Sequence, residues 1–109
     1  MTVWIFESNL MWSSRFVNTV RGSGHVAVVT TTVPEGAAGA AIVNLGDPNV
    51  GPIVSELASR GIYTIAHAGH KEKELINLGK QMKVDRVASN SEITNKLPQM
   101  LDDATAQKS

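Results

Sequence analysis

The chain contains no cysteine in its 109 residues. This absence excludes disulfide bonds, thiolate catalysis and zinc sites that are built on cysteine. A chain without cysteine suits the reducing environment of the cytoplasm, and we expect the protein to reside there.

Excess charge of either sign is also missing. Lys and Arg together number 10, Asp and Glu together number 10, and the formal net charge is zero. A balanced chain lacks the basic surface that binds nucleic acid or an anionic membrane. We therefore expect neither of these partners.

Long hydrophobic runs and phosphate-binding loops are missing as well. No apolar run approaches the ~20 residues of a membrane-spanning helix. The early Glu7, with no basic segment before it, is not typical of a signal peptide. No Gly-x-Gly-x-x-Gly follows the first apolar run, and no Gly-Lys-Ser/Thr occurs. We expect no cofactor and no bound metal.

The composition is typical of a soluble globular protein, with 42% hydrophobic and 18% charged residues. A chain of this length can bury a core without cross-links, and we expect one domain. We place that domain at residues 1–101 and expect the polar residues 102–109 to form a frayed tail. Of the two tryptophans, Trp4 is expected in the core and Trp12 at its margin.

Short apolar runs rich in β-branched residues alternate with helical patterns. The runs that predict strands are residues 3–6, 25–30, 40–45, 62–66 and 85–89. The patterns that predict helices are residues 10–21, 52–60 and 71–82. Asn9 is a suitable cap for the first helix, and the third is expected to bury Leu75, Leu78 and Met82. The fifth strand is the least apolar, so we place it at an edge of the sheet.

Most of these strands are apolar throughout rather than at every second residue. Helices cover both faces of such strands, which predicts an α/β fold with a five-stranded parallel, doubly wound sheet. Only residues 31–39 join the second strand to the third, whereas a parallel crossover normally takes a dozen residues or more. The second helix is therefore expected to be short or absent, which would leave one sheet face thinly covered near the first strand.

The end of the chain allows two arrangements. Ser91 could open a helix, but Pro98 would then lie in its interior at a cost of about 3 kcal/mol. We therefore predict a short turn over residues 91–96 and a final helix that begins near Pro98.

Three segments carry a resemblance to a known family. Residues 41–48 read AIVNLGDP, residues 84–89 read VDRVAS, and residues 90–101 read NSEITNKLPQML. In this order they resemble the receiver domain of response regulators, and the likeness extends from Val3 to about Leu101. The resemblance implies a flavodoxin-like fold with strand order 2-1-3-4-5.

The resemblance also assigns roles to positions, most of which have lost the side chain that the role needs. In receivers an acidic pair holds Mg²⁺, an aspartate accepts the phosphoryl group, and a hydroxyl and a lysine contact the phosphate. The corresponding positions here are Glu7 with Ser8, Asn44, His67 and Ser89. An amide cannot form an acyl phosphate, so the resemblance implies a degenerate pseudo-receiver that is not phosphorylated and is not an enzyme.

Asp47 closely follows the third strand and allows several interpretations. Within Gly-Asp-Pro it suits a turn, and turn chemistry explains the residue type fully. It could instead be a displaced phosphoryl acceptor, or hold a cation together with Glu7. His67 and His70 could also ligate a metal, but a His-x₂-His pair in a loop is a weak signal without a fixed third ligand.

Two functions are compatible with this pattern. The first is a regulatory, signal-transducing module that binds another protein or a second copy of itself. The alternative is a small-ligand or anion binder that uses a pocket at the carboxyl ends of the strands, where such folds bind ligands. The candidate pocket residues are Glu7, Ser8, Asn44, Asp47, His67 and Ser89.

Overall fold

The computed structural model describes residues 1–69 and 71–107, in which strands alternate with helices. The strands are β1 (Thr2–Phe6), β2 (Val26–Val29), β3 (Ala40–Asn44), β4 (Tyr63–Ala68) and β5 (Arg86–Ser89). The helices are α1 (Leu10–Gly22), α2 (Val50–Ser59), α3 (Lys73–Gln81) and α4 (Asn90–Gln107).

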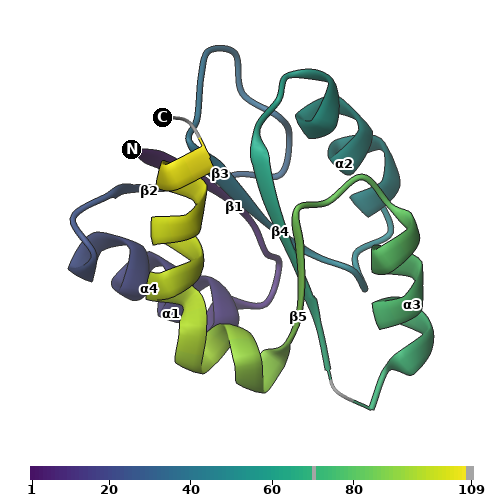
Figure 1. Ribbon diagram of the computed structural model, residues 1–109. Helices are drawn as coiled ribbons and strands as arrows, with labels where there is room; N and C mark the ends of the chain where they lie inside the picture. The colour runs from purple at the N-terminus through teal and green to yellow at the C-terminus, as the bar shows by residue number, and fades with distance from the viewer. Residues whose placement is uncertain (70, 108–109) are drawn as a thin grey trace.

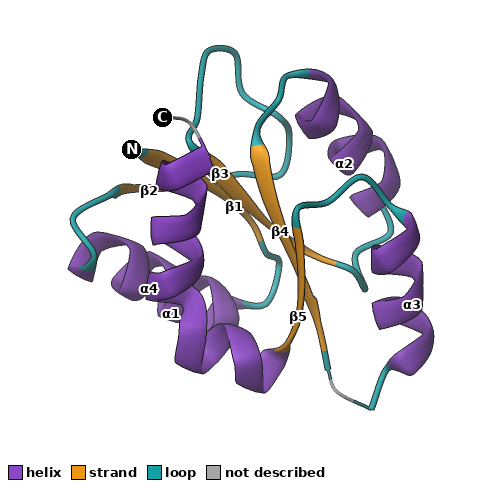
Figure 2. Cartoon of the chain, in the orientation of Figure 1, coloured by secondary structure: helices purple, strands orange, loops and turns teal. Residues whose placement is uncertain are grey.

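All five strands are parallel, and their order across the sheet is β2-β1-β3-β4-β5. Helices α1 and α4 lie on one face of the sheet, and α2 and α3 lie on the other (Figure 1 and Figure 2). The predicted doubly wound parallel sheet, its strand order and the edge position of β5 are therefore confirmed.

Strand β1 separates two hydrophobic cores. Successive side chains point to opposite faces of a strand. Val3 and Ile5 therefore enter the core under α1 and α4, whereas Trp4 and Phe6 enter the core under α2. All four side chains are buried. The unbroken apolar run of β1 thus reflects cover on both faces, as the sequence predicted.

The segment between β2 and β3 contains no helix, which confirms the expected absence. It packs Val33 and Ala38 into the core that holds Trp4. It leaves Val26 and Val28 of β2 at 60% and 37% exposure. The thinly covered region is therefore β2, which lies directly beside β1, while this segment covers Trp4 of β1 itself.

Helix α1 begins as the sequence predicts. The Asn9 Oδ1 accepts hydrogen bonds from the backbone N–H groups of Met11 and Trp12, at 3.0 and 3.2 Å, and so caps the helix. The helix ends at Gly22, and Gly24 turns the chain toward β2 with a φ of +85°. Glycine adopts this left-handed conformation without strain.

Helix α4 begins at Asn90 and continues to Gln107, so the predicted turn over residues 91–96 is wrong. Ser89 and Glu92 form a capping box at its start. The Ser89 Oγ accepts from the Glu92 N–H, and the Glu92 Oε1 accepts from the Ser89 N–H, both at 3.2 Å. These two bonds fix the beginning of the helix well before Pro98.

Tertiary packing explains why α4 tolerates Pro98 in its interior. Pro98 is exposed, and residues on the opposite side of the helix are buried, namely Ile93, Leu97, Met100, Leu101 and Ala104. Burial of this face outweighs the hydrogen bond that proline cannot make. The buried Ala104 also continues the helix into residues 102–107, which the sequence assigned to a polar tail.

Helix α3 buries fewer apolar side chains than its sequence pattern predicts. Leu75 and Met82 are half-buried, but Leu78 is 44% exposed, so its predicted burial is wrong. Gly79 takes the inward position instead, and a Cβ there would lie only 2.7 Å from Leu45 Cδ1. The helix backbone therefore approaches the sheet at Gly79, which turns Leu78 outward.

Replacing Pro98 with alanine should stabilise the protein by about 1 to 3 kcal/mol, because alanine restores the missing N–H in the interior of α4. Urea unfolding measures the change. The matched control is Pro52→Ala in the first turn of α2, where the N–H has no helical partner, so stability should stay nearly constant. Equal effects of the two substitutions would contradict this account of α4.

Candidate functional site

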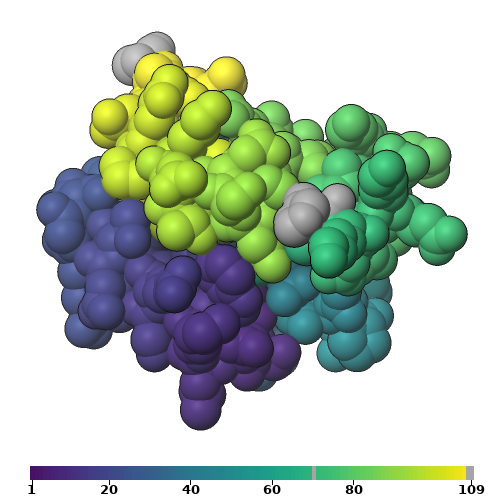
Figure 3. All heavy atoms as spheres, turned by 90° about the horizontal axis from the view of Figure 1, so that it is seen from below, coloured from purple at the N-terminus to yellow at the C-terminus, as the bar shows by residue number. Residues whose placement is uncertain are grey.

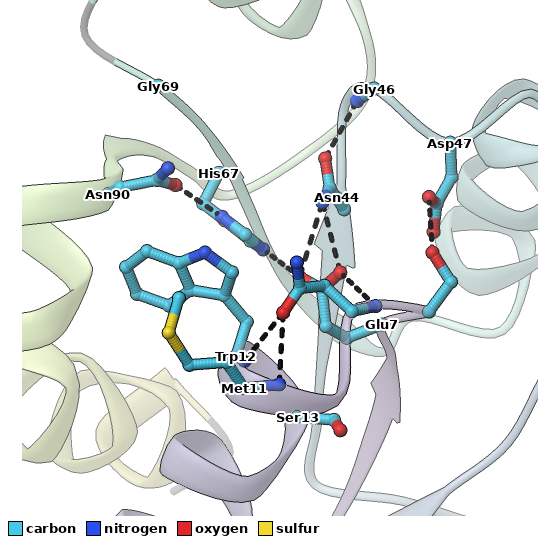
Figure 4. A network of polar contacts seen from close by, with 12 residues as sticks. Glu7, Met11, Trp12, Ser13, Asn44, Gly46, Asp47, His67, Gly69 and Asn90 are labelled. Atoms are coloured by element: carbon cyan, nitrogen blue, oxygen red, sulfur yellow. Dashed lines mark hydrogen bonds and ion pairs between the residues drawn. The ribbon is translucent and has the colours of Figure 1, made fainter.

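Four polar side chains from different elements meet at the carboxyl ends of the strands (Figure 4). Glu7 follows β1, Asn44 ends β3, His67 lies in β4 and Asn90 opens α4. Strands β1, β3 and β4 are neighbours in the sheet, and the register places Asn44 beside His67. We call these four residues the Glu7–His67 network.

Glu7 is the centre of this network and is 6% exposed. Its Oε1 lies 2.8 Å from His67 Nε2. The Asn44 Nδ2 donates to Oε1 and Oε2 at 3.2 and 3.0 Å, and the Asn9 backbone N–H donates to Oε2 at 3.2 Å. Both oxygens of this carboxylate are therefore occupied by protein donors.

Two opposing effects act on the pKa of Glu7. Burial raises the pKa, because the charged form loses hydration. The hydrogen bonds from His67, Asn44 and Asn9, together with the electrostatic attraction of His67, outweigh burial and hold the pKa below its ordinary value of 4.5. Glu7 is therefore a carboxylate at neutral pH.

His67 is 1% exposed, and protein side chains surround its imidazole ring. Its Nδ1 lies 2.8 Å from Asn90 Oδ1, while its Nε2 faces Glu7. Phe16 meets the imidazole in an edge contact with centroids 5.1 Å apart, and the Trp12 ring lies at 6.0 Å. An oxygen therefore faces each ring nitrogen, Glu7 Oε1 at Nε2 and Asn90 Oδ1 at Nδ1, so both nitrogens are occupied by protein partners.

Ser8 and Asp47 form a second contact at the same edge of the sheet. The Ser8 Oγ donates to Asp47 Oδ1 at 3.2 Å. The Asp47 N–H donates to the Asn44 carbonyl at 3.0 Å, so the residue lies in a turn. Burial and the charge of Glu7 raise the pKa of Asp47 above its ordinary value of 3.8, against the Ser8 hydrogen bond and the attraction of His67.

The structure brings together only part of the predicted pocket. Glu7, Asn44 and His67 are in direct contact. Ser89 is not part of their network, because its hydroxyl caps α4. His70 lies outside the described residues, and among those that are described no group of three or more His, Cys, Asp and Glu side chains is arranged to hold a metal ion.

Sequence reasoning missed the role of Asn90. The available signal was its position directly after β5, where a side chain reaches the same edge of the sheet as His67. The contact between the Phe16 ring in α1 and His67 was missed as well. Contacts of this kind depend on how the helices pack against the sheet, and the sequence pattern does not specify this packing.

A cavity of about 540 Å³ opens beside the network, between the ends of β1 and β2 and the start of α2. Glu7, Ser8, Thr31 and Asp47 contribute to its walls, and no Lys, Arg or His side chain does. His67 lies outside it. The view from below shows the purple N-terminal segment in direct contact with the yellow-green segment of α4 (Figure 3), in keeping with the burial of His67.

No family model and no curated protein matches this sequence, but solved structures match the fold over nearly its whole length. The receiver domain of the TMAO respiratory system response regulator TorR has a TM-score of 0.82 at 14% identity, with 97% of each chain covered. A response regulator receiver protein from Pseudoalteromonas atlantica has a TM-score of 0.80 at 9% identity, with 100% of each chain covered. A sensor protein from Polaromonas sp. JS666 has a TM-score of 0.77 at 15% identity, covering 99% of this chain and 98% of that one.

The chain has the fold of a response-regulator receiver domain. The receiver fold that the sequence resemblance implied is thus confirmed. At identities this low the likeness concerns the fold, so the role of each residue depends on the contacts of this chain itself. Within residues 1–69 and 71–107, no helix is both long enough and apolar enough to cross a membrane.

Replacing Glu7 with glutamine should lower the free energy of unfolding at neutral pH by about 3 kcal/mol, because it removes the charge that His67 and Asn44 surround. The pKa of Glu7 is depressed in the folded state. The charge therefore stabilises the fold above about pH 4.5, and this stabilisation is lost as the pH falls through the folded pKa. Urea unfolding across a pH series should show the two proteins converging in acid.

The matched control is Glu35→Gln, which removes an exposed carboxylate from the segment between β2 and β3. This variant should keep the pH dependence of the wild type. A difference between wild type and Glu7→Gln that stayed constant down to acid pH would mean that the Glu7 charge does not stabilise the network.

Proposed function

We propose that this chain is a regulatory module with a receiver fold that is not phosphorylated and that acts by binding protein, without catalytic turnover. The Asn44 amide carries this proposal. Its Nδ2 donates to both oxygens of Glu7, and its Oδ1 accepts from the Gly46 N–H at 2.8 Å. By the receiver resemblance this position belongs to the phosphoryl acceptor, and an amide held at both ends supplies no nucleophilic carboxylate.

The other positions of the resemblance support the same proposal. Mg²⁺ takes several oxygen ligands and keeps part of its water, but both oxygens of Glu7 already accept from protein donors. Ser8 adds no second carboxylate, and Ser89 stands where a lysine would contact the phosphate. A phosphoryl group would lack both its acceptor and the positive charge that stabilises it.

His67 stands in the place of the receiver hydroxyl and links separate parts of the fold. Through Glu7, Asn90 and Phe16 it connects β4 with β1, α4 and α1. Side chains that satisfy one another in this way favour a single arrangement of the site. We therefore infer that regulation acts through the surface of the domain, in a cytoplasmic signalling pathway, rather than through a change of state inside the pocket.

Incubation with acetyl phosphate and Mg²⁺ tests the absence of phosphorylation. We expect no mass increase by intact-protein mass spectrometry, and no thermal stabilisation by beryllofluoride with Mg²⁺. Asp47→Asn is the informative variant, because Asp47 lies close to the acceptor position and its carboxylate, unlike that of Glu7, is not part of the Glu7–His67 network. A phosphoryl adduct on the wild type that disappears in Asp47→Asn would replace this proposal with a displaced acceptor.

The cavity beside the network favours a second candidate function, the binding of a small ligand. It holds two carboxylates and no basic side chain, so its electrostatic potential favours a neutral or cationic ligand over an anion. His67 lies outside the cavity, so it has no part in this function.

A thermal-shift screen tests the second function with Mg²⁺, inorganic phosphate, nucleotides and small aromatic amines. We expect phosphate and nucleotides to leave the melting temperature unchanged. A stabilising amine should lose its effect in Asp47→Asn and keep it in Glu35→Gln. Stabilisation by phosphate that Asp47→Asn does not alter would show that the cavity chemistry described here is wrong.

A further inference from the structure

Strand β2 is an edge strand whose outer side has free hydrogen-bonding groups. Along a parallel ladder, alternate residues direct their N–H and C=O groups to the same neighbour. The N–H groups of Val26 and Thr30 donate to β1, to the carbonyls of Met1 and Ile5. Ala27 and Val29 therefore direct their backbone groups away from β1, toward the open side of the sheet.

Although β2 has only four residues, this edge lacks the other features that usually prevent strand pairing. Proteins protect such edges with charged side chains, bulges or a covering helix. Residues 26–34 contain no charged side chain, and no helix follows β2. Val26, Val28 and Val29 are 60%, 37% and 51% exposed. The opposite edge differs, because β5 contains Arg86 and follows Asp85.

We propose that two copies of this chain associate by antiparallel pairing of β2 with β2, about a two-fold axis that passes beside Val28. In this register Ala27 of each copy faces Val29 of the other, and their free backbone groups form four hydrogen bonds. The two sheets become one sheet with the strand order β5-β4-β3-β1-β2 continued by β2-β1-β3-β4-β5. The inference extends the proposed function by naming a second copy as the binding partner.

Charge at the two ends of β2 favours a second copy in this orientation. The end where β2 begins carries the Met1 ammonium, which lies 3.1 Å from His25 Nδ1, and Arg21 in the last turn of α1. The end where it finishes reaches the cavity that is walled by Thr31, Asp47 and Glu7. Antiparallel pairing places residue 25 of each copy opposite Thr31 of the other, so the end with the Met1 ammonium and Arg21 lies beside the end with Asp47 twice.

The same register covers the exposed valines. Val28 pairs with Trp4 in the sheet, so it points to the face where the second helix is absent. The two-fold axis places Val28 of one copy directly beside Val28 of the other, as a pair without mutual backbone hydrogen bonds. Val26 lies opposite Thr30 of the second copy. The apolar surface of β2 that is exposed in one chain is thereby buried between the two copies.

A single introduced cysteine tests this register, because the natural chain has none. Antiparallel pairs of this type have Cα atoms about 4.5 Å apart, which is within disulfide range. Val28→Cys should therefore form a disulfide-linked dimer under mild copper–phenanthroline oxidation. Val26→Cys is the matched control: it is more exposed, but the two copies of residue 26 would lie about 13 Å apart along the strands.

A dimer that forms with Val28→Cys and not with Val26→Cys supports the proposal. Equal cross-linking of both variants, or of neither, would overturn it. Size-exclusion chromatography with light scattering should give twice the chain mass for the wild type. It should give one chain mass for Ala27→Pro, whose lost N–H points away from β1, and for Val28→Lys, with circular dichroism confirming that both remain folded.

The outcome is independent of the phosphorylation test. A monomeric wild type that takes up no phosphoryl group would remove the β2 pairing and leave a regulatory module that binds a different protein. A dimer that is phosphorylated would retain the pairing and remove the proposed function.

Discussion

The contact between Glu7 and His67 is the interaction on which the rest of the carboxyl edge depends. A carboxylate that is 6% exposed is stable only when donors replace the water it has lost. His67 and Asn44 supply those donors from β4 and β3, and the Asn9 backbone supplies another from the start of α1. Because His67 also contacts Asn90, the charge of one residue after β1 determines how β3, β4, α1 and α4 meet.

Such a network has a consequence for how the domain can respond to signals. Within the described residues no buried side-chain nitrogen or oxygen lacks a partner. A ligand that entered the network would have to replace hydrogen bonds that are already made, which leaves little net free energy for binding. The chain therefore combines the fold of a receiver domain with side chains at the carboxyl ends of the strands that act as an internal link. Features that remain open to a partner lie elsewhere, at the edge of β2 and in the cavity beside Asp47.

The sequence predicted those parts of the fold that depend on local pattern. Apolar runs located the strands, Asn9 marked the start of α1, and the length of residues 31–39 indicated that a helix there is short or absent. Prediction from the sequence failed where tertiary packing overrode the local preference of a residue. Pro98 disfavours a helix by itself, yet buried Leu97 and Leu101 hold one in place, and Gly79 turns Leu78 outward. The sequence marked Glu7, Asn44 and His67 as candidate site residues, but their mutual contacts arise only when the sheet places Asn44 beside His67.

The absence of a helix after β2 affects how this molecule can associate with a second copy. Without a helix after β2, Val26 and Val28 on one face of this strand, and a row of backbone groups along its edge, face solvent. A free edge of this kind is normally selected against, since it promotes association. The zero net charge of the chain adds no general repulsion between copies. Association at β2 would bury what the missing helix leaves bare. The backbone groups that pair lie on the side of β2 away from β1, whereas Glu7 bonds to β3, β4 and the start of α1, so pairing leaves the contacts of Glu7 intact.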